Sequence, residues 1–402
     1  MNDLLWKAIH KVAGMGSSTS GDTRKRELEA SSSRRVRVSL NPTEKQREDL
    51  FRRGFGHART YLALPSVTSP RWLFPLENGH SPWAGLRVYG PCTCRARVMK
   101  TLLAALVASR CQAFLPHRLL VASPGSLAVE DLVREVTGDE DPVFALSLST
   151  EKHFRKLTMQ VMCPNGEVRG YIKLPLTDAA GERVRQEAET LTRLASFPAL
   201  LPHVPRVLYA GDWGGSPILF QSPGPSHRGP SHLDRQCAEF LQLLWRTHPV
   251  CKPGLTVWEE VATVWHKVGR TLDLHWWTLG ERALATARRE LGKAELPCGI
   301  VHGDFAPWNL RSGDDGLYVF DWESARWEAP VLWDIFHFVT QAAAHLKRNH
   351  VPMSWGRWSG DRASFLLYLL SSACQLATED SPMRSAGLEC RRQLLLRQLE
   401  GH

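Results

Sequence analysis

Three residues between positions 296 and 323 have types and spacing that suit phosphoryl transfer: Asp304, Asn309 and Asp321. Such a transfer needs one carboxylate to orient the acceptor hydroxyl, and further oxygen ligands to hold magnesium on the phosphates. We predict that Asp304 serves the hydroxyl and that Asn309 and Asp321 hold the metal. The alternative, two strands and a turn that carry acids by chance, is less specific than three suitable residues at motif spacing.

Two short strands are expected to position this triad. Ile300 and Val301 end an apolar strand directly before the polar loop that carries Asp304. Residues 317–320 form a second apolar strand that ends on Asp321. The intervening Ser-Gly-Asp-Asp-Gly at 312–316 predicts a hairpin turn, because glycine adopts positive φ without a steric penalty.

The order His302-Gly303-Asp304, four residues, Asn309, then a strand ending in Asp321 resembles one branch of the protein kinase-like superfamily. This branch contains the aminoglycoside phosphotransferases and the choline kinases, and the Asp-to-Asn spacing is that of a kinase catalytic loop. The resemblance implies an α+β, two-lobed protein kinase-like fold, with a small antiparallel-sheet lobe and a large helical lobe. It also implies ATP and Mg2+ as cofactors.

The resemblance extends over about residues 141–345. It places Lys173 where the family keeps its phosphate-binding lysine, and Glu187, in a predicted helix over 181–194, where a glutamate orients that lysine. A solvated lysine and a surface glutamate are the alternative. Residues 150–156 contain no glycine, unlike the phosphate-covering loop of protein kinases. The first three strands of the small lobe are predicted at residues 144–149, 157–163 and 168–174.

Two more strands, over 204–210 and 217–222, would lead to the hinge between the lobes. Backbone groups near Gln221 and Ser222 would meet adenine there, although the Pro and Gly content also fits a plain linker. Helices over 233–247 and 281–291 would build the large lobe. Four tryptophans between these helices suit either a sugar-binding pocket or the core: Trp258, Trp265, Trp276 and Trp277.

Two further residues of the motif region match supporting positions of the family. Asp334 corresponds to its trailing aspartate, which supports the catalytic loop without needing to touch substrate. His302 has a tempting position for acid-base work, but in this fold it buttresses the loop. We therefore predict a structural role for His302.

The basic charge of the chain is concentrated near its N-terminus. The net charge is +9, and residues 1–129 hold 20 Lys and Arg against 8 Asp and Glu. This region could face an anionic membrane surface or a lipid carrier, with nucleic acid a less favoured partner, or it could be a solvated basic surface. A helix over 96–109 packs an apolar stripe on its neighbours or, alternatively, lies on a membrane. Residues 71–76 and 86–89 are predicted strands.

Cysteine usage and hydropathy predict a cytoplasmic protein, which the basic region could bring to the membrane periphery. The nine cysteines include no Cys-x-x-Cys pair, which disfavours a disulfide framework or a zinc site. Lys7, His10 and Lys11 interrupt the first apolar residues, so no signal peptide is expected. The longest apolar run is far shorter than the roughly 20 residues of a membrane-spanning helix.

The sequence therefore predicts an ATP- and Mg-dependent phosphotransferase acting on a hydroxyl of a small molecule or glycan, such as a surface-polysaccharide or glycolipid precursor. The alternative is a pseudokinase, a nucleotide-binding scaffold that docks on an anionic partner through its basic region. The expected organisation is a disordered tail (1–38), a basic extension (39–140), an N-lobe (141–222) and a C-lobe (223–402) with the acceptor pocket.

Overall fold

A computed structural model of the chain describes residues 8–9, 12, 36–76, 82–88, 94–108, 117–149, 152–346, 360–378 and 384–400. The chain divides into two compact units, and the division falls within helix α6 (Asp178–Leu194). The first unit comprises Met1–Thr150, Phe154–Ala188 and Val207–Pro223; the second comprises Glu151–His153, Glu189–Arg206 and Gly224–His402. Most of the predicted tail, 1–38, lies outside the described residues.

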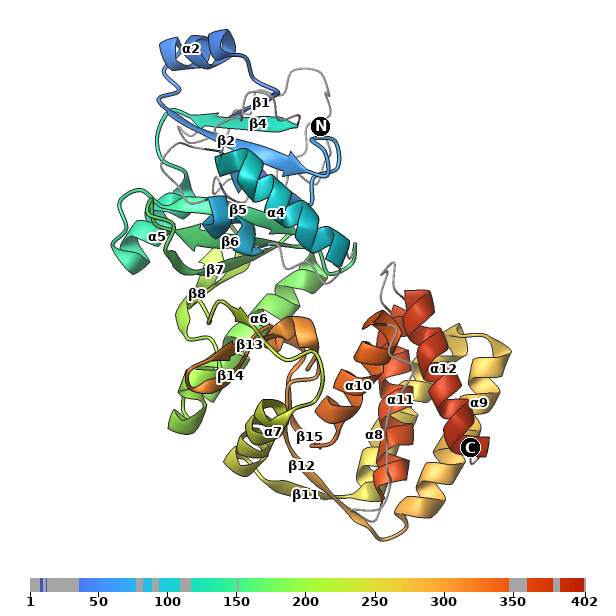
Figure 1. The fold of residues 1–402 in the computed structure, drawn as a ribbon. Helices are drawn as coiled ribbons and strands as arrows, with labels where there is room; N and C mark the ends of the chain where they lie inside the picture. Colours follow the sequence, from blue (N-terminus) through green and yellow to red (C-terminus); the bar gives the residue numbers. More distant parts are fainter. Residues whose placement is uncertain are drawn as a thin grey trace. The chain divides into compact units, whose positions relative to one another are not determined.

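The first unit is built on one antiparallel nine-stranded sheet, with the strand order β1-β4-β2-β3-β5-β6-β7-β9-β8 (Figure 1). The strands β3 and β5 pair through Trp72 with Ser147 and Leu73 with Leu146. Strands on both sides of residue 140 therefore belong to one sheet. The strands are β1 (Arg37–Leu40), β2 (His57–Leu64), β3 (Trp72–Pro75), β4 (Arg118–Ser123), β5 (Val143–Leu148), β6 (Lys156–Met162), β7 (Val168–Pro175), β8 (Val207–Trp213) and β9 (Ser216–Gln221).

Alternating apolar residues fix the register of the central strands. Leu157, Met159 and Val161 on β6 are fully buried, as are Ile172 and Leu174 on β7. A slip of one residue would turn these side chains to the opposite face, so their burial specifies the pairing. The strands predicted at 144–149, 157–163 and 168–174 are confirmed within one residue at each end.

The helices of the first unit include α6, which carries Glu187. One predicted element of this unit is corrected by the structure. Residues 86–88 form a short 3-10 helix, η1 (Leu86–Val88), and not a strand. Pro82 begins α3 and the chain continues in a helical turn, and a four-residue apolar run cannot distinguish the two structures by periodicity. The other helices are α2 (Glu44–Arg52), α3 (Pro82–Gly85), α4 (Cys94–Ala108) and α5 (Ala128–Thr137).

The second unit contains two small antiparallel sheets that hold the predicted catalytic region. One has the order β10-β13-β14 and the other β11-β12-β15. The predicted hairpin is present: Gly313 pairs with Gly316 at its turn, and Gly316 has a φ of +107°. The strands are β10 (His227–Arg228), β11 (Val250–Pro253), β12 (Glu295–Val301), β13 (Leu310–Gly313), β14 (Gly316–Val319) and β15 (Arg326–Pro330).

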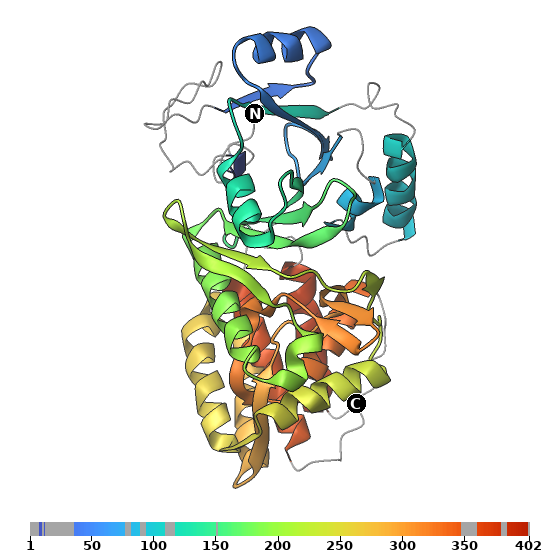
Figure 2. The same cartoon turned by 90° about the vertical axis from the view of Figure 1, so that its left-hand side faces the viewer.

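Helices make up the remainder of the second unit, and Figure 2 shows them gathered beside the small strands. Helix α11 is buried around almost its whole circumference, as expected for a central helix. Asp234 and Asp273 cap α7 and α9 by accepting hydrogen bonds from backbone N–H groups. The helices are α7 (Arg235–Thr247), α8 (Gly254–Val268), α9 (Leu274–Leu291), α10 (Trp333–Leu346), α11 (Asp361–Thr378) and α12 (Arg384–Glu400).

The observed architecture confirms the predicted fold class, an antiparallel-sheet unit and a largely helical unit. A helix that spans a bilayer needs about 20 predominantly apolar residues. Among the described residues, no helix is both long and apolar enough to span a membrane.

Candidate functional site

The loop between β12 and β13 begins with a glycine that no other residue could replace without distortion. Gly303 has a φ of +79°, a conformation that side chains disfavour. A Cβ at this position would lie 2.1 Å from the backbone oxygen of Ser324, far inside contact distance. The glycine of the His-Gly-Asp motif is therefore required by both backbone conformation and packing.

Asp334 anchors this loop from the start of α10. Its carboxylate accepts hydrogen bonds from the backbone N–H groups of His302, at 2.7 Å, and of Gly303, at 2.9 Å. Complete burial raises the pKa of Asp334, and the two N–H donors act in the opposite direction by favouring the charged form. The predicted role of Asp334 as a support of the loop is confirmed.

His302 is a buried structural residue, as predicted. Its Nδ1 accepts the backbone N–H of Asp304 at 3.2 Å, so the ring proton lies on Nε2, which donates to the carbonyl of Phe320 at 3.1 Å. Burial lowers the pKa of His302 and favours this neutral form. The ring also packs edge-on against Trp322, with centroids 4.6 Å apart. These contacts tie the loop to the end of β14.

Asp304 presents a carboxylate whose two oxygens are both held by neighbours. Oδ2 accepts a hydrogen bond from the amide of Asn309 at 2.8 Å, and Oδ1 lies 2.8 Å from Nε2 of His337. The side chain is 32% exposed, although His337 is nearly buried. An oriented and accessible carboxylate of this kind is suited to accept a proton from a hydroxyl group.

The side-chain nitrogen of Asn309 donates hydrogen bonds within the loop, and its side-chain oxygen is therefore the atom that can bind a cation. Nδ2 donates both to the backbone oxygen of Asp304, at 2.9 Å, and to Oδ2 of the same residue. The orientation of the amide group follows from these two acceptors. A hard oxygen at this position suits Mg2+, which prefers oxygen ligands.

Asp321 has a left-handed backbone conformation, with a φ of +71°, two residues after the end of β14. Aspartate and asparagine tolerate this region better than other side chains, and such outliers concentrate at functional sites. Trp322, which follows, is fully buried and donates from Nε1 to the carbonyl of Val319 at 2.9 Å. The carboxylate of Asp321, like the side-chain oxygen of Asn309, is a ligand of the kind that Mg2+ prefers.

The first unit contains the predicted lysine and glutamate as a buried ion pair. Nζ of Lys173 lies 2.6 Å from both carboxylate oxygens of Glu187. The lysine side chain is 5% exposed and the glutamate is fully buried. Burial of two charges costs free energy that a close, bidentate contact offsets. The predicted pairing is therefore present, whereas a solvated lysine and a surface glutamate are excluded.

Gln221 and Ser222 lie at the end of β9, and both are nearly buried. Gln221 pairs across the sheet with Tyr171. Its side-chain oxygen, Oε1, has no hydrogen-bond partner among the residues described by the structure. Buried acceptors are normally satisfied, so this oxygen marks a position where a donor from a ligand or water would fit.

The four tryptophans between the predicted large-lobe helices belong to the core or pack against it. Trp265 is fully buried, and Trp276 is nearly so. A Cβ at Gly280 would lie 1.9 Å from the Trp265 ring, so this glycine lets α8 and α9 pack closely. Trp277 stacks on Trp265 with centroids 5.9 Å apart, and Nε1 of Trp258 donates to the carbonyl of Leu284 at 2.8 Å. Of the two interpretations, the core is the one these contacts support.

Two residues that the sequence did not single out extend the site: His337 on α10 and Tyr368 on α11. The Tyr368 hydroxyl lies 3.2 Å from Nδ1 of His337. His337 follows Asp334 by three residues, which places both on one face of a helix. That spacing was a usable signal for His337. No local signal points to Tyr368, because it reaches His337 only through the packing of α10 on α11.

The site contains a loop suited to phosphoryl transfer, and comparison with known proteins shows what the chain is similar to. Residues 169–363, nearly half of the chain, match the model of the phosphotransferase enzyme family. This similarity confirms the resemblance predicted from the sequence. The predicted cofactors, ATP and Mg2+, agree with the similarity to this family. No curated protein matches the chain at a significant level.

Solved aminoglycoside phosphotransferases resemble the chain at low identity. They include a thermostable mutant of APH(4)-Ia without ligand, with 14% identity, a TM-score of 0.47 and coverage of 68% of this chain and 99% of that one. The GDP complex of aminoglycoside 2'-phosphotransferase-IIIa has 14% identity, a TM-score of 0.44 and coverage of 66% and 97%. With TM-scores below 0.5, these structures carry no conclusion about the chemistry of this chain.

Proposed function

We propose that the protein transfers a phosphoryl group from ATP to a hydroxyl of a small molecule or glycan. The observation that carries the proposal is the partly exposed carboxylate of Asp304, which two neighbours hold, beside an asparagine whose side-chain oxygen is left for a cation. In this assignment Asp304 accepts the proton of the acceptor hydroxyl at a carboxylate oxygen. Each carboxylate oxygen has two lone pairs, so the contacts to Asn309 and His337 leave room for this proton.

The nucleotide and the metal are assigned to the residues predicted from the sequence. Asn309 and Asp321 would hold Mg2+, and Lys173, oriented by Glu187, would neutralise phosphate charge. Gln221 and Ser222 would line the nucleotide site at the end of β9. When bound, Mg-ATP supplies the phosphoryl group, and the protein contributes position and charge. The N-lobe (141–222) and C-lobe (223–402) would carry these two sets of residues, in the cytoplasm.

We expect Mg-ATP to stabilise the protein and the exchange Asp321→Ala to abolish this effect. A ligand that binds only the folded state raises stability by about 2.7 kcal/mol at a hundredfold excess over its Kd. Thermal unfolding with and without Mg-ATP measures the shift. Asp315→Ala is the matched control, because Asp315 is an exposed acid in the β13–β14 turn. An unshifted wild-type protein would remove the nucleotide from the proposal.

The test of the transfer itself is a screen of hydroxylated acceptors with γ-labelled ATP. Sugars, glycolipid precursors and aminoglycosides are the first candidates, and labelled product identifies the acceptor class. If Mg-ATP stabilises the protein but no acceptor becomes labelled and no ATP is hydrolysed, the pseudokinase alternative is favoured. The protein would then act as a nucleotide-binding scaffold.

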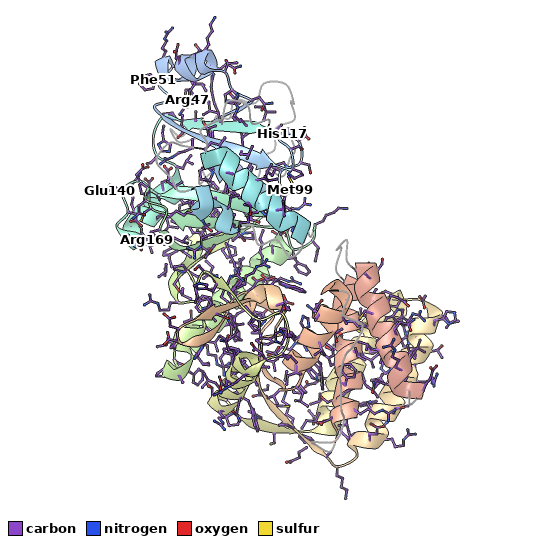
Figure 3. The ribbon with its side chains drawn as sticks, in the orientation of Figure 1. Arg47, Phe51, Met99, His117, Glu140 and Arg169 are labelled. Atoms are coloured by element: carbon purple, nitrogen blue, oxygen red, sulfur yellow. The ribbon has the colours of Figure 1, made fainter. Side chains whose placement is uncertain are left out.

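A second observation supports an anionic membrane surface or lipid carrier as partner of the basic region. No Asp or Glu occurs between Glu77 and Glu130, whereas six basic residues do: Arg87, Arg95, Arg97, Lys100, Arg110 and Arg118. Within this segment, α4 exposes the apolar side chains of Val98, Met99 and Leu102, each more than half exposed. Figure 3 labels Met99 on this helix. Exposed apolar residues in a cationic segment are typical of helices that bind anionic bilayers.

Vesicle flotation tests this partner. The protein is expected to float with vesicles of 70% phosphatidylcholine and 30% phosphatidylserine, and to remain free with pure phosphatidylcholine. The double exchange Val98→Ser/Leu102→Ser should lower the vesicle affinity by about 100-fold or more, since each buried apolar side chain contributes about 1.5–3 kcal/mol and about 1.4 kcal/mol is a factor of ten. Leu274→Ser, at an exposed leucine of α9, is the control. Equal binding of both vesicle types would refute an electrostatic attachment.

A further inference from the structure

A chain of hydrogen-bonding groups runs from Asp304 into the interior of the helical unit. Oδ1 of Asp304 lies 2.8 Å from Nε2 of His337, and Nδ1 of His337 lies 3.2 Å from the hydroxyl of Tyr368. His337 is on α10 and Tyr368 on α11, so two separate helices contribute. Both side chains are nearly buried, whereas the Asp304 carboxylate is the exposed end of the chain.

The donors and acceptors of this chain can be assigned from chemistry. An ionised carboxylate only accepts, so the proton between Asp304 and His337 lies on Nε2. In the neutral imidazole, Nδ1 then accepts the hydroxyl proton of Tyr368. Burial raises the pKa of Tyr368, which keeps the phenol protonated and able to donate. The amide nitrogen of Gln341, one turn along α10, lies 3.1 Å from the same Nε2. Because both nitrogens carry protons in this assignment, that contact is not a hydrogen bond.

Aromatic packing holds Tyr368, the buried end of this chain of hydrogen-bonding groups. The Tyr368 ring stacks on Phe365 with centroids 6.2 Å apart and contacts Phe336 at 5.9 Å. Phe336 in turn packs edge-on against Phe365 at 4.9 Å. Because these contacts hold Tyr368 in place, its hydroxyl group can fix the position of His337, and His337 can fix that of Asp304. Precise placement of a reacting group depends on such support.

We propose that His337 is a positioning residue for Asp304, and that Tyr368 fixes its ring orientation and tautomer. This inference rests on the proposed function of Asp304. Asn309 holds one carboxylate oxygen and His337 the other, so together they remove the rotation of the carboxylate about its side-chain bonds. Correct orientation of a reacting group lowers the entropic part of the barrier. His337 thus acts through Asp304 and does not itself contact the acceptor.

The test compares His337→Ala, His337→Gln and Tyr368→Phe with wild type. His337→Ala is expected to lower kcat by about 10- to 100-fold, the usual cost of losing a supporting hydrogen bond in an active site. The KM for ATP should change less than threefold. Glutamine places an amide N–H near the position of Nε2, so His337→Gln should recover most of kcat. Tyr368→Phe should give an intermediate loss.

Leu370→Ala is the matched control for packing, because Leu370 is a fully buried residue of α11 outside the ring contacts that hold Tyr368, and the exchange removes no polar group. It is expected to lower the melting temperature and to leave kcat unchanged. The proposal is overturned if His337→Ala keeps the wild-type kcat, or if Leu370→Ala lowers kcat as much as His337→Ala does. If His337→Ala fails to fold, the kcat values of His337→Gln and Tyr368→Phe decide by the same criteria.

A spectroscopic measurement separates this inference from the proposed function. In protein labelled with 15N-histidine, His337 should show a protonated Nε2 and an unprotonated Nδ1, with its signals assigned from their loss in His337→Gln. Asp304→Asn should shift the Nε2 resonance, and Tyr368→Phe the Nδ1 resonance. Unchanged resonances would refute the chain of contacts, even in an active enzyme. If these shifts occur while wild type transfers phosphate to no acceptor and hydrolyses no ATP, the proposed function fails and the positioning of Asp304 stands.

Discussion

The exchange Asp304→Asn is expected to reduce phosphate transfer by a factor on the order of 10² or more, as for a positioned acid-base group. The amide has nearly the same shape as the carboxylate but cannot accept the proton of the acceptor hydroxyl. Because this role appears mainly in the transition state, Mg-ATP should still stabilise the variant. Initial rates with an acceptor from the screen, together with thermal unfolding in Mg-ATP, measure both quantities.

The control for this exchange is Asp314→Asn, an exposed acid in the β13–β14 turn that is expected to leave turnover unchanged. Asparagine at position 304 has only one side-chain oxygen, so it can satisfy either Asn309 or His337 but not both. A modest loss of stability, of about 1 kcal/mol, would follow from this mismatch. Equal turnover of wild type and Asp304→Asn would contradict the assignment of the base.

The exchange Lys173→Met is expected to destabilise the protein by about 3–5 kcal/mol, the usual cost of removing one partner from a buried ion pair. It leaves the fully buried carboxylate of Glu187 without the cation that now lies 2.6 Å away. The double exchange Lys173→Met/Glu187→Leu removes both charges. It should recover most of the lost stability, because an apolar pair of similar volume can replace a buried ion pair.

Thermal unfolding with and without Mg-ATP separates the structural and functional roles of this pair. The double variant should remain folded and yet show a greatly reduced shift with Mg-ATP, because the phosphate-binding charge is gone. A full Mg-ATP shift in the double variant would mean that the pair serves stability alone. Lys293→Met, at an exposed lysine after α9, supplies a control for the loss of a lysine in the same unfolding assay, and should retain the shift.

The sequence by itself determined the parts of this protein whose geometry is local. Asp304, Asn309 and Asp321 lie within 18 residues, so a strand, a loop and a hairpin suffice to specify their spacing. The strand alternation around Lys173 and the helical spacing around Glu187 also indicate which faces those side chains occupy. Asp334 and His302 were assigned supporting roles that their hydrogen bonds confirm.

Only the tertiary structure decided which distant segments meet. Leu86–Val88 forms a helical turn because of the chain that precedes it, and Trp265 is a core residue because Gly280 makes space for its ring. His337 reaches Asp304 across 33 residues, and Tyr368 reaches His337 only through the packing of α11 on α10. Propensity and periodicity describe one element at a time, whereas these contacts depend on side chains that fit together across elements. Of this buried polar chain, the three-residue spacing from Asp334 to His337 is a local pattern in the sequence, whereas the contact with Tyr368 leaves none.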